Sequence, residues 1–130
     1  MTPELFYLSL TTLLTALLWI PYTLNMISVR GLADAVGYPE HPRALAPWAA
    51  RLKNAHANAV ENLVVFAALV LVADALAVSG PATAMSSMVF FWARLVHAVA
   101  YTFAIPWVRT LAFVVGFLSQ MCSAWQILAG

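Results

Sequence analysis

Charge is what this sequence has least of. Only 8% of its 130 residues are charged, and six basic against five acidic side chains leave a net charge of +1. Soluble domains carry about a quarter of charged residues, whereas this chain is 64% hydrophobic with a mean hydropathy of +0.89. We therefore expect an integral membrane protein whose first partner is the lipid bilayer. A charge balance so close to zero provides no basic field for nucleic acid, and we expect no nucleic-acid partner.

Cysteine is nearly absent too. Cys122 stands alone, which excludes an intrachain disulfide and a thiolate metal cluster, and we expect no metal site. The beginning of the chain has no basic region. Its apolar stretch before Arg30 is much longer than the roughly 7 to 15 residues of a signal-peptide core, so we interpret it as a retained membrane helix.

Apolar runs dominate what is there, and turn residues divide them. A bilayer core needs about 20 helical residues, and we predict four spans at about 3–29, 48–78, 81–105 and 107–128. Gly80-Pro81 and Pro106 predict short hairpins, because proline lacks the amide donor and disfavours helix in the residue before it. Pro21 predicts a kink in the first span. The long loop from Gly31 to Pro47 is too rich in glycine and proline to be one helix.

The expected fold is therefore all-α: a single domain over residues 1–130, forming a left-handed bundle of four transmembrane helices. Alternating spans place Arg30, Lys53 and Arg109 on one side of the membrane, and the positive-inside rule makes that side cytoplasmic. We expect a multi-pass protein, in the inner membrane if the source is bacterial, with any site near these residues facing the cytoplasm.

Two polar clusters interrupt the apolar spans. On the second span, five side chains fall within about a third of the helix circumference: Arg51, Asn54, Asn58, Glu61 and Asn62. On the third span, Arg94, His97 and Tyr101 share a face, and Arg109 with Thr110 begins the fourth. A charge near the bilayer centre costs roughly 2.5 to 3.5 kcal/mol, so such groups usually face other helices or a water-filled cavity.

Two interpretations of these clusters remain open. The first is that they only lock the bundle, with Glu61 paired to an arginine and the amides bridging helices. Interhelical polar contacts in membranes average only about 0.6 kcal/mol, however, so helix association rarely needs this many charges. Three arginines, Arg51, Arg94 and Arg109, meet a single nearby carboxylate. The second interpretation, a pocket for an anionic ligand, follows from that imbalance.

Taken together, Asn58-x-x-Glu61, Arg94-x-x-His97-x-x-x-Tyr101 and Arg109-Thr110 resemble the MAPEG family, the membrane-associated proteins of eicosanoid and glutathione metabolism. The resemblance covers nearly the whole chain. It implies a homotrimer of four-helix subunits, with glutathione as cosubstrate in a site between neighbours. The residues that it places around glutathione are Arg30, Arg51, Asn58, Glu61, Arg94, His97, Tyr101 and Thr110. It makes Arg109 the catalytic residue.

The physical chemistry of Arg109 agrees with that role. Glutathione attacks as a thiolate, and a guanidinium beside the sulfur favours the anion. Arg109 also begins a helix just after Pro106, where the positive end of the helix dipole favours negative charge. We expect Thr110 to donate a hydrogen bond to the same sulfur. The predicted activity is a glutathione-dependent transferase or peroxidase acting on lipophilic small molecules that are electrophiles.

Two other functions remain open at this point. Ala57 and Asn54 stand where glutathione-handling members often carry arginine, which supports a catalytically inactive member that acts as a membrane interaction protein. A small multidrug transporter is a third possibility, because such carriers also have four spans. They need a proton-coupled carboxylate, commonly in the first span, and here that span has only the terminal Glu4.

Overall fold

The chain folds entirely into helices and turns. The computed structural model describes all 130 residues, and its helices, in order, are α1 (Pro3–Leu17), α2 (Trp19–Arg30), α3 (Leu32–Val36), α4 (Pro47–Ala75), α5 (Pro81–Thr102) and α6 (Pro106–Ala129). α1 and α2 together form one span, and α4, α5 and α6 form the others; all four are long and apolar enough to cross a bilayer. The expectation of four long apolar helices is confirmed, and the protein is a multi-pass integral membrane protein.

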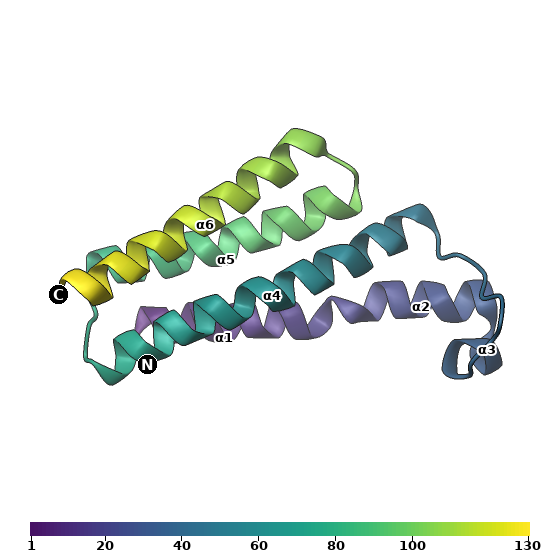
Figure 1. Ribbon diagram of the computed structural model, residues 1–130, viewed down its shortest axis with the longest axis horizontal. Coiled ribbons are helices and arrows are strands. Elements are labelled where there is room, and N and C mark those ends of the chain that lie inside the picture. Colours follow the sequence, from purple (N-terminus) through teal and green to yellow (C-terminus); the bar gives the residue numbers. More distant parts are fainter.

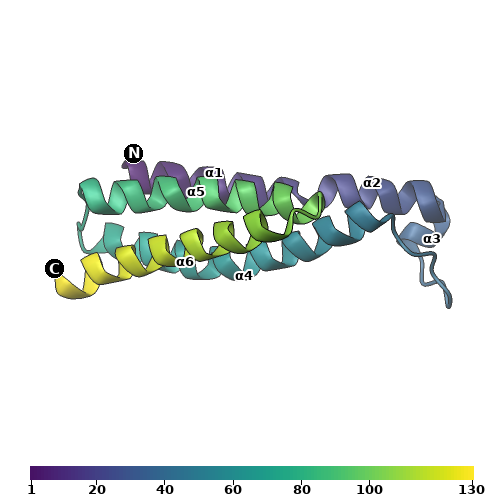
Figure 2. The same cartoon turned by 90° about the horizontal axis from the view of Figure 1, so that it is seen from above.

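The spans run back and forth as two hairpins. Figure 1 shows α5 and α6 lying side by side above α4 and the α1–α2 span, with both termini and the α4–α5 turn at one end. The long loop and the α5–α6 turn lie towards the other end. In both views α2 and the loop extend beyond the α5–α6 hairpin (Figures 1 and 2). The end of α2 is therefore not covered by the second hairpin.

The first span breaks where we expected a kink. Pro21 has no amide hydrogen to give to the carbonyl one turn earlier. The regular helix accordingly ends at Leu17, and the Leu18 amide makes only a long 3.4 Å bond to the Thr15 carbonyl before α2 begins at Trp19. The break thus divides the first span into α1 and α2.

The long loop is held at both of its ends. Gly31 closes α2 with φ of +79°, a conformation that glycine adopts without strain. Further along, the Ala46 amide donates to Oδ1 of Asn25 at 3.0 Å, and Nε of Arg30 donates to the Arg43 carbonyl at 2.8 Å. These bonds tie the loop back onto α2. The short α3 confirms that the loop is not one regular helix.

The two short turns are built alike. The residue that follows the last turn of each helix is left-handed, with φ of +55° at Ala77 and +57° at Ala104. After α4 the Val78 amide donates to the Ala73 carbonyl at 2.8 Å, and the equivalent bond after α5 has the same length. This is the pattern of a Schellman motif, which glycine usually completes. Alanine therefore stores backbone strain at both turns.

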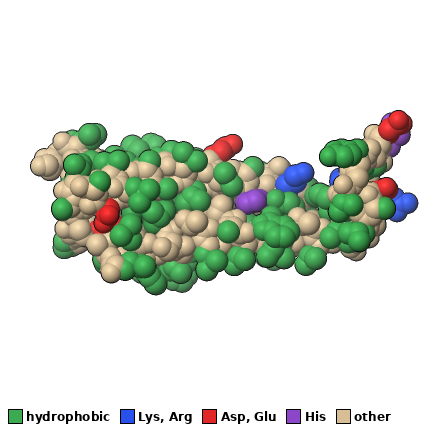
Figure 3. Space-filling view, turned by 90° about the horizontal axis from the view of Figure 1, so that it is seen from below, with side chains coloured by type: hydrophobic (Ala, Val, Ile, Leu, Met, Phe, Trp, Pro, Cys, Tyr) green, Lys and Arg blue, Asp and Glu red, His purple; other side chains and the backbone are tan.

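Few large side chains are buried. The rings of Phe66 and Phe90 stack with their centroids 4.0 Å apart, and Val70 packs with them. Most other buried positions on α4 are small, as at Ala49, Ala55 and Ala59, which lets helix backbones approach closely. On the face shown in Figure 3, hydrophobic side chains are spread along the helices, and several charged side chains lie at the loop end. That distribution suits lipid as the surrounding solvent.

A buried carboxylate fixes the end that carries the termini. Glu4 is 4% exposed, and its carboxylate accepts hydrogen bonds from the Ser79 hydroxyl at 3.0 Å and from the Thr83 hydroxyl. The contact joins the start of α1 to the α4–α5 turn. These hydrogen bonds hold the two segments together at this end of the bundle.

Candidate functional site

The five polar residues that share one face of α4, which we call the polar stripe, differ in their burial. Arg51, Asn58 and Asn62 are half-buried, whereas Asn54 and Glu61 are exposed. At about 100° per residue the first three lie within about 40° of one another, and the other two lie at one edge of the stripe. α5 and α6 thus cover only part of the face that the sequence defines.

The covered part of the stripe borders a hollow between three helices. Its volume is about 290 Å³, and it is lined by Asn58, His97, Tyr101, Arg109, Thr110 and Phe113. α4 supplies the amide, α5 the imidazole and phenol, and α6 the guanidinium, hydroxyl and phenyl ring. We call it the polar hollow. No acidic side chain lines it.

A second, smaller hollow lies beside it at the α5–α6 turn. Its volume is about 160 Å³, and its lining is Arg51, Ala100, Tyr101, Ala104, Ile105, Pro106 and Arg109. We call it the turn hollow. Tyr101 and Arg109 line both hollows, and the Arg109 guanidinium carbon lies 4.7 Å from the centre of the Tyr101 ring. This cation–π pair therefore stands between the two hollows.

Arg94 lies behind the polar hollow and lines neither one. Its side chain is 4% exposed. Nη2 donates to Oδ1 of Asn58 at 2.7 Å and contacts Nδ1 of His97 at 3.3 Å. Nε is buried and has no hydrogen-bond partner. Arg94 thus reaches the hollow through two neighbours rather than directly.

The same network continues along α4 to α6. Nδ2 of the Asn62 side chain donates to the backbone carbonyl of Asn58 at 2.9 Å and to Oδ1 of Asn58 at 3.3 Å. Nε2 of Gln120, on α6, donates to the Asn62 carbonyl at 3.2 Å. Three helices are therefore joined behind the polar hollow by amides and one guanidinium.

Arg51 is tied to the end of α5. Its Nε donates to the Thr102 carbonyl at 2.9 Å, which is one of the carbonyls left without a partner where the helix ends. A cation at this point also suits the negative end of the helix dipole. The rest of the guanidinium borders the turn hollow, beside Arg109. Arg51 and Arg109 therefore add two positive charges to one small space.

The hydroxyl of Thr110 is only weakly engaged. It donates to the Pro106 carbonyl at 3.3 Å, within the first turn of α6. A bond of that length is at the far limit of useful geometry. Thr110 therefore keeps a hydroxyl that is available at the polar hollow.

Most of the candidate residues from the sequence meet around these two hollows. The residues that line them are Arg51, Asn58, His97, Tyr101, Arg109 and Thr110. Arg94 is adjacent but buried. Glu61 is exposed and lines neither hollow, and Arg30 lies at the end of α2, bonded to the loop. Within one chain the structure does not bring Arg30 or Glu61 to the others, and their roles stay predictions.

Sequence reasoning assigned no role to three participants, Phe113, Asn62 and Gln120. A signal existed for two of them, because Phe113 and Gln120 follow Arg109 by four and eleven residues and so lie on its face of α6. Asn62 belonged to the polar stripe already. Its link to Asn58 across one helical turn is a common spacing for side-chain contacts.

His56 lines neither hollow. Its Nδ1 is 2.7 Å from the Tyr22 hydroxyl, and the contact joins α4 to α2. No group of three or more His, Cys, Asp or Glu side chains is arranged to hold a metal ion.

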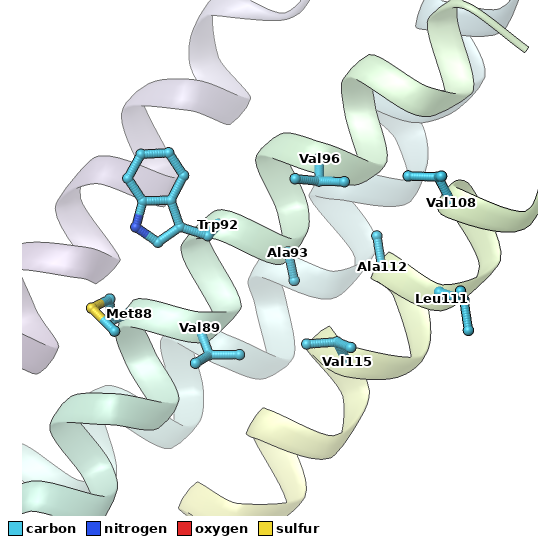
Figure 4. Close-up of a pocket in the computed structure, with 9 residues that line it drawn as sticks. All are labelled: Met88, Val89, Trp92, Ala93, Val96, Val108, Leu111, Ala112 and Val115. Atoms are coloured by element: carbon cyan, nitrogen blue, oxygen red, sulfur yellow. The ribbon is translucent and has the colours of Figure 1, made fainter. Parts of the chain in front are cut away.

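An apolar groove lies on the other flank of the α5–α6 pair. It encloses about 380 Å³ and is lined only by hydrophobic residues, which are labelled in Figure 4: Met88, Val89, Trp92, Ala93, Val96, Val108, Leu111, Ala112 and Val115. At about 100° per residue, Val108 and Leu111 fall on the side of α6 away from Phe113. The groove offers contact for hydrocarbon but carries no reactive group.

Comparison with known proteins places the chain in one family. The sequence profile of the MAPEG family matches residues 8–129. No curated protein and no solved structure shows significant similarity to the chain. The profile spans nearly all of the four membrane helices and both hollows. The protein is therefore a member of the MAPEG family.

Proposed function

We propose that this protein is a glutathione-dependent transferase or peroxidase that acts on lipophilic electrophiles. The observation that supports it best is the position of Arg109. Its guanidinium borders two hollows at once, and neither hollow is lined by an acidic side chain. A cation in such a place, within a membrane span, favours an anionic occupant.

The chemistry assigned to Arg109 is stabilisation of a thiolate. With the sulfur in the polar hollow, the guanidinium offers a charge-assisted hydrogen bond, and the Thr110 hydroxyl turns from the Pro106 carbonyl to the sulfur. The thiol proton leaves to water. The thiolate then attacks the electrophilic carbon, a carbon–sulfur bond forms, and the leaving group departs with the electron pair of the bond that breaks.

The remaining lining residues hold the rest of the tripeptide in this proposal. Arg51 beside the turn hollow binds a carboxylate, and Asn58, His97 and Tyr101 border the sulfur. The polar hollow, at about 290 Å³, is near the lower limit of small-molecule sites. Displacement of the Tyr101 ring joins it to the turn hollow and gives a peptide more room.

We also propose a homotrimer, with the site closed by a neighbouring subunit. Glu61 lies near the middle of α4 yet is exposed, as are Arg109 and Thr110. Lipid does not satisfy such groups, so a second subunit is the natural cover. A neighbour also offers a route for Arg30 to reach the ligand. In this arrangement the site faces the cytoplasm, and the membrane is the inner one if the source is bacterial.

Conjugation of glutathione to a generic aryl halide tests the proposal. Purified wild-type protein should form the thioether, and Arg109→Met should lose at least about tenfold in rate, equivalent to about 1.4 kcal/mol of transition-state stabilisation. Lys53→Met, which removes an exposed cation from α4, is the matched control and should retain the wild-type rate. A silent wild type, or equal rates for both variants, would contradict the proposal.

The alternative is a family member without catalysis. It is favoured by Asn54 and Ala57, which are exposed and uncharged at positions where added arginines would strengthen glutathione binding. An inactive member should show no conjugation with any electrophile. Absent or only millimolar binding of glutathione, together with no conjugation, would support this alternative over the enzyme.

A further inference from the structure

Arg94 is the most buried cation of the site, and its contacts suggest a role apart from ligand binding. We propose that Arg94 and Asn62 are positioning residues, which turn the Asn58 amide and the His97 ring so that both present N–H groups to the polar hollow. Only the identity of the anion rests on the proposed function. The orientation of the two side chains follows from the hydrogen bonds alone.

The Asn58 amide has one orientation that fits its neighbours. Arginine has N–H donors and no acceptor, so the atom 2.7 Å from Nη2 of Arg94 must be the amide oxygen. The Asn62 amide nitrogen, at 3.3 Å, donates to the same oxygen. Both donors thus lie on the oxygen side of Asn58. Its NH2 group has no protein partner and is not among the buried unpaired atoms, and Asn58 lines the hollow.

The His97 ring is fixed by the same argument. Nη2 of Arg94 is 3.3 Å from Nδ1, and since the guanidinium only donates, Nδ1 must accept. The ring proton then belongs on Nε2. His97 is 3% exposed and lines the polar hollow, so its remaining N–H is the polar atom that it can offer there.

Arg94 therefore influences the polar hollow indirectly, through Asn58 and His97. It occupies the acceptor atoms of Asn58 and His97 and leaves their donors for an occupant. With the Arg109 guanidinium and the Tyr101 and Thr110 hydroxyls, every polar lining group is then able to donate. A hollow of this kind favours an anion over a cation or a neutral acceptor-poor molecule.

The tautomer of His97 tests the inference without any ligand. Nitrogen-15 and carbon-13 labelled histidine in detergent-solubilised wild-type protein reports which ring nitrogen carries the proton. His97 is identified among the three histidines by the signal lost in His97→Gln. We expect the proton on Nε2 in the wild type and in Arg94→Lys, which keeps a donor, and a mixture of tautomers in Arg94→Met. A wild-type ring protonated on Nδ1 would overturn the inference.

Asn58→Asp separates donor orientation from folding. The aspartate keeps an oxygen for Arg94, so the variant should be at least as stable as the wild type, yet it replaces N–H donors in the hollow with oxygen. Glutathione binding should weaken at least tenfold. Asn54→Asp places the same charge on an exposed position of α4 and should change binding much less. Equal losses in both variants would show that charge alone is responsible and would contradict the inference.

The two proposals fail in different ways. If His97 carries its proton on Nε2 in the wild type but glutathione does not bind, the positioning role is supported and the proposed function is overturned. If glutathione binds and His97 is protonated on Nδ1, the positioning role is overturned and the proposed function is supported.

Discussion

Removal of the Asn58 side-chain amide should lower the free energy of unfolding, because it leaves the buried Arg94 guanidinium without its acceptor. In Asn58→Leu the guanidinium loses its 2.7 Å acceptor, while the side chain stays 4% exposed and its Nε already lacks a partner. Neutral interhelical hydrogen bonds in membranes average only about 0.6 kcal/mol. A hydrogen bond to a charged group contributes about 1.5 to 3 kcal/mol. We expect the larger range here, because the donor is charged and buried.

Reversible unfolding in mixed micelles, followed by helical circular dichroism, measures this change. Asn54→Leu makes the same substitution one turn away at an exposed position, and it should alter the free energy of unfolding by less than about 0.5 kcal/mol. The comparison removes the effects of helix propensity and hydrophobicity. Equal stability of the two variants would refute the claim that Asn58 carries a buried guanidinium.

Two further changes test the turns and the first hairpin. Ala77→Gly should raise the free energy of unfolding by about 0.5 to 1 kcal/mol, because Ala77 has φ of +55°. Ala68→Gly, at an exposed position in the middle of α4, should lower it by about 1 kcal/mol. Loss of stability in both variants would contradict the strain argument. Tyr22→Phe removes the 2.7 Å contact with His56 and should lower the free energy of unfolding by about 0.5 to 1.5 kcal/mol. Tyr38→Phe, in the exposed loop, should leave it unchanged. Equal stability of these two variants would show that the α2–α4 contact does not stabilise the bundle.

The spans were predictable because length, hydropathy and proline act locally. Pro81 and Pro106 each open a helix in the structure as the sequence indicated. The left-handed residues at Ala77 and Ala104 were not predictable, since alanine gives no signal for that conformation and the turn geometry is imposed by the packing of adjacent helices. Local chemistry thus fixed the elements, while the exact turns depended on tertiary contacts.

Periodicity identified the faces of the polar residues but not their depth. Arg94 and His97 were expected to contact the ligand, and the structure places only His97 at the polar hollow. Glu61 shared the stripe of Asn58 but is exposed. A helical angle gives direction around one axis, whereas burial depends on how far the neighbouring helices extend. For that reason the roles of Arg94 and Asn62 emerged only from their hydrogen bonds.

Titration of glutathione into detergent-solubilised protein is the most direct test of the proposal that Arg109 stabilises a thiolate. The ultraviolet absorbance of the thiolate and the heat of binding are both recorded. The wild type should bind with a sub-millimolar dissociation constant and show thiolate absorbance at neutral pH, and Arg109→Met should lose the absorbance and bind at least tenfold more weakly. Absence of binding, or an equal thiolate signal in both proteins, would contradict the account.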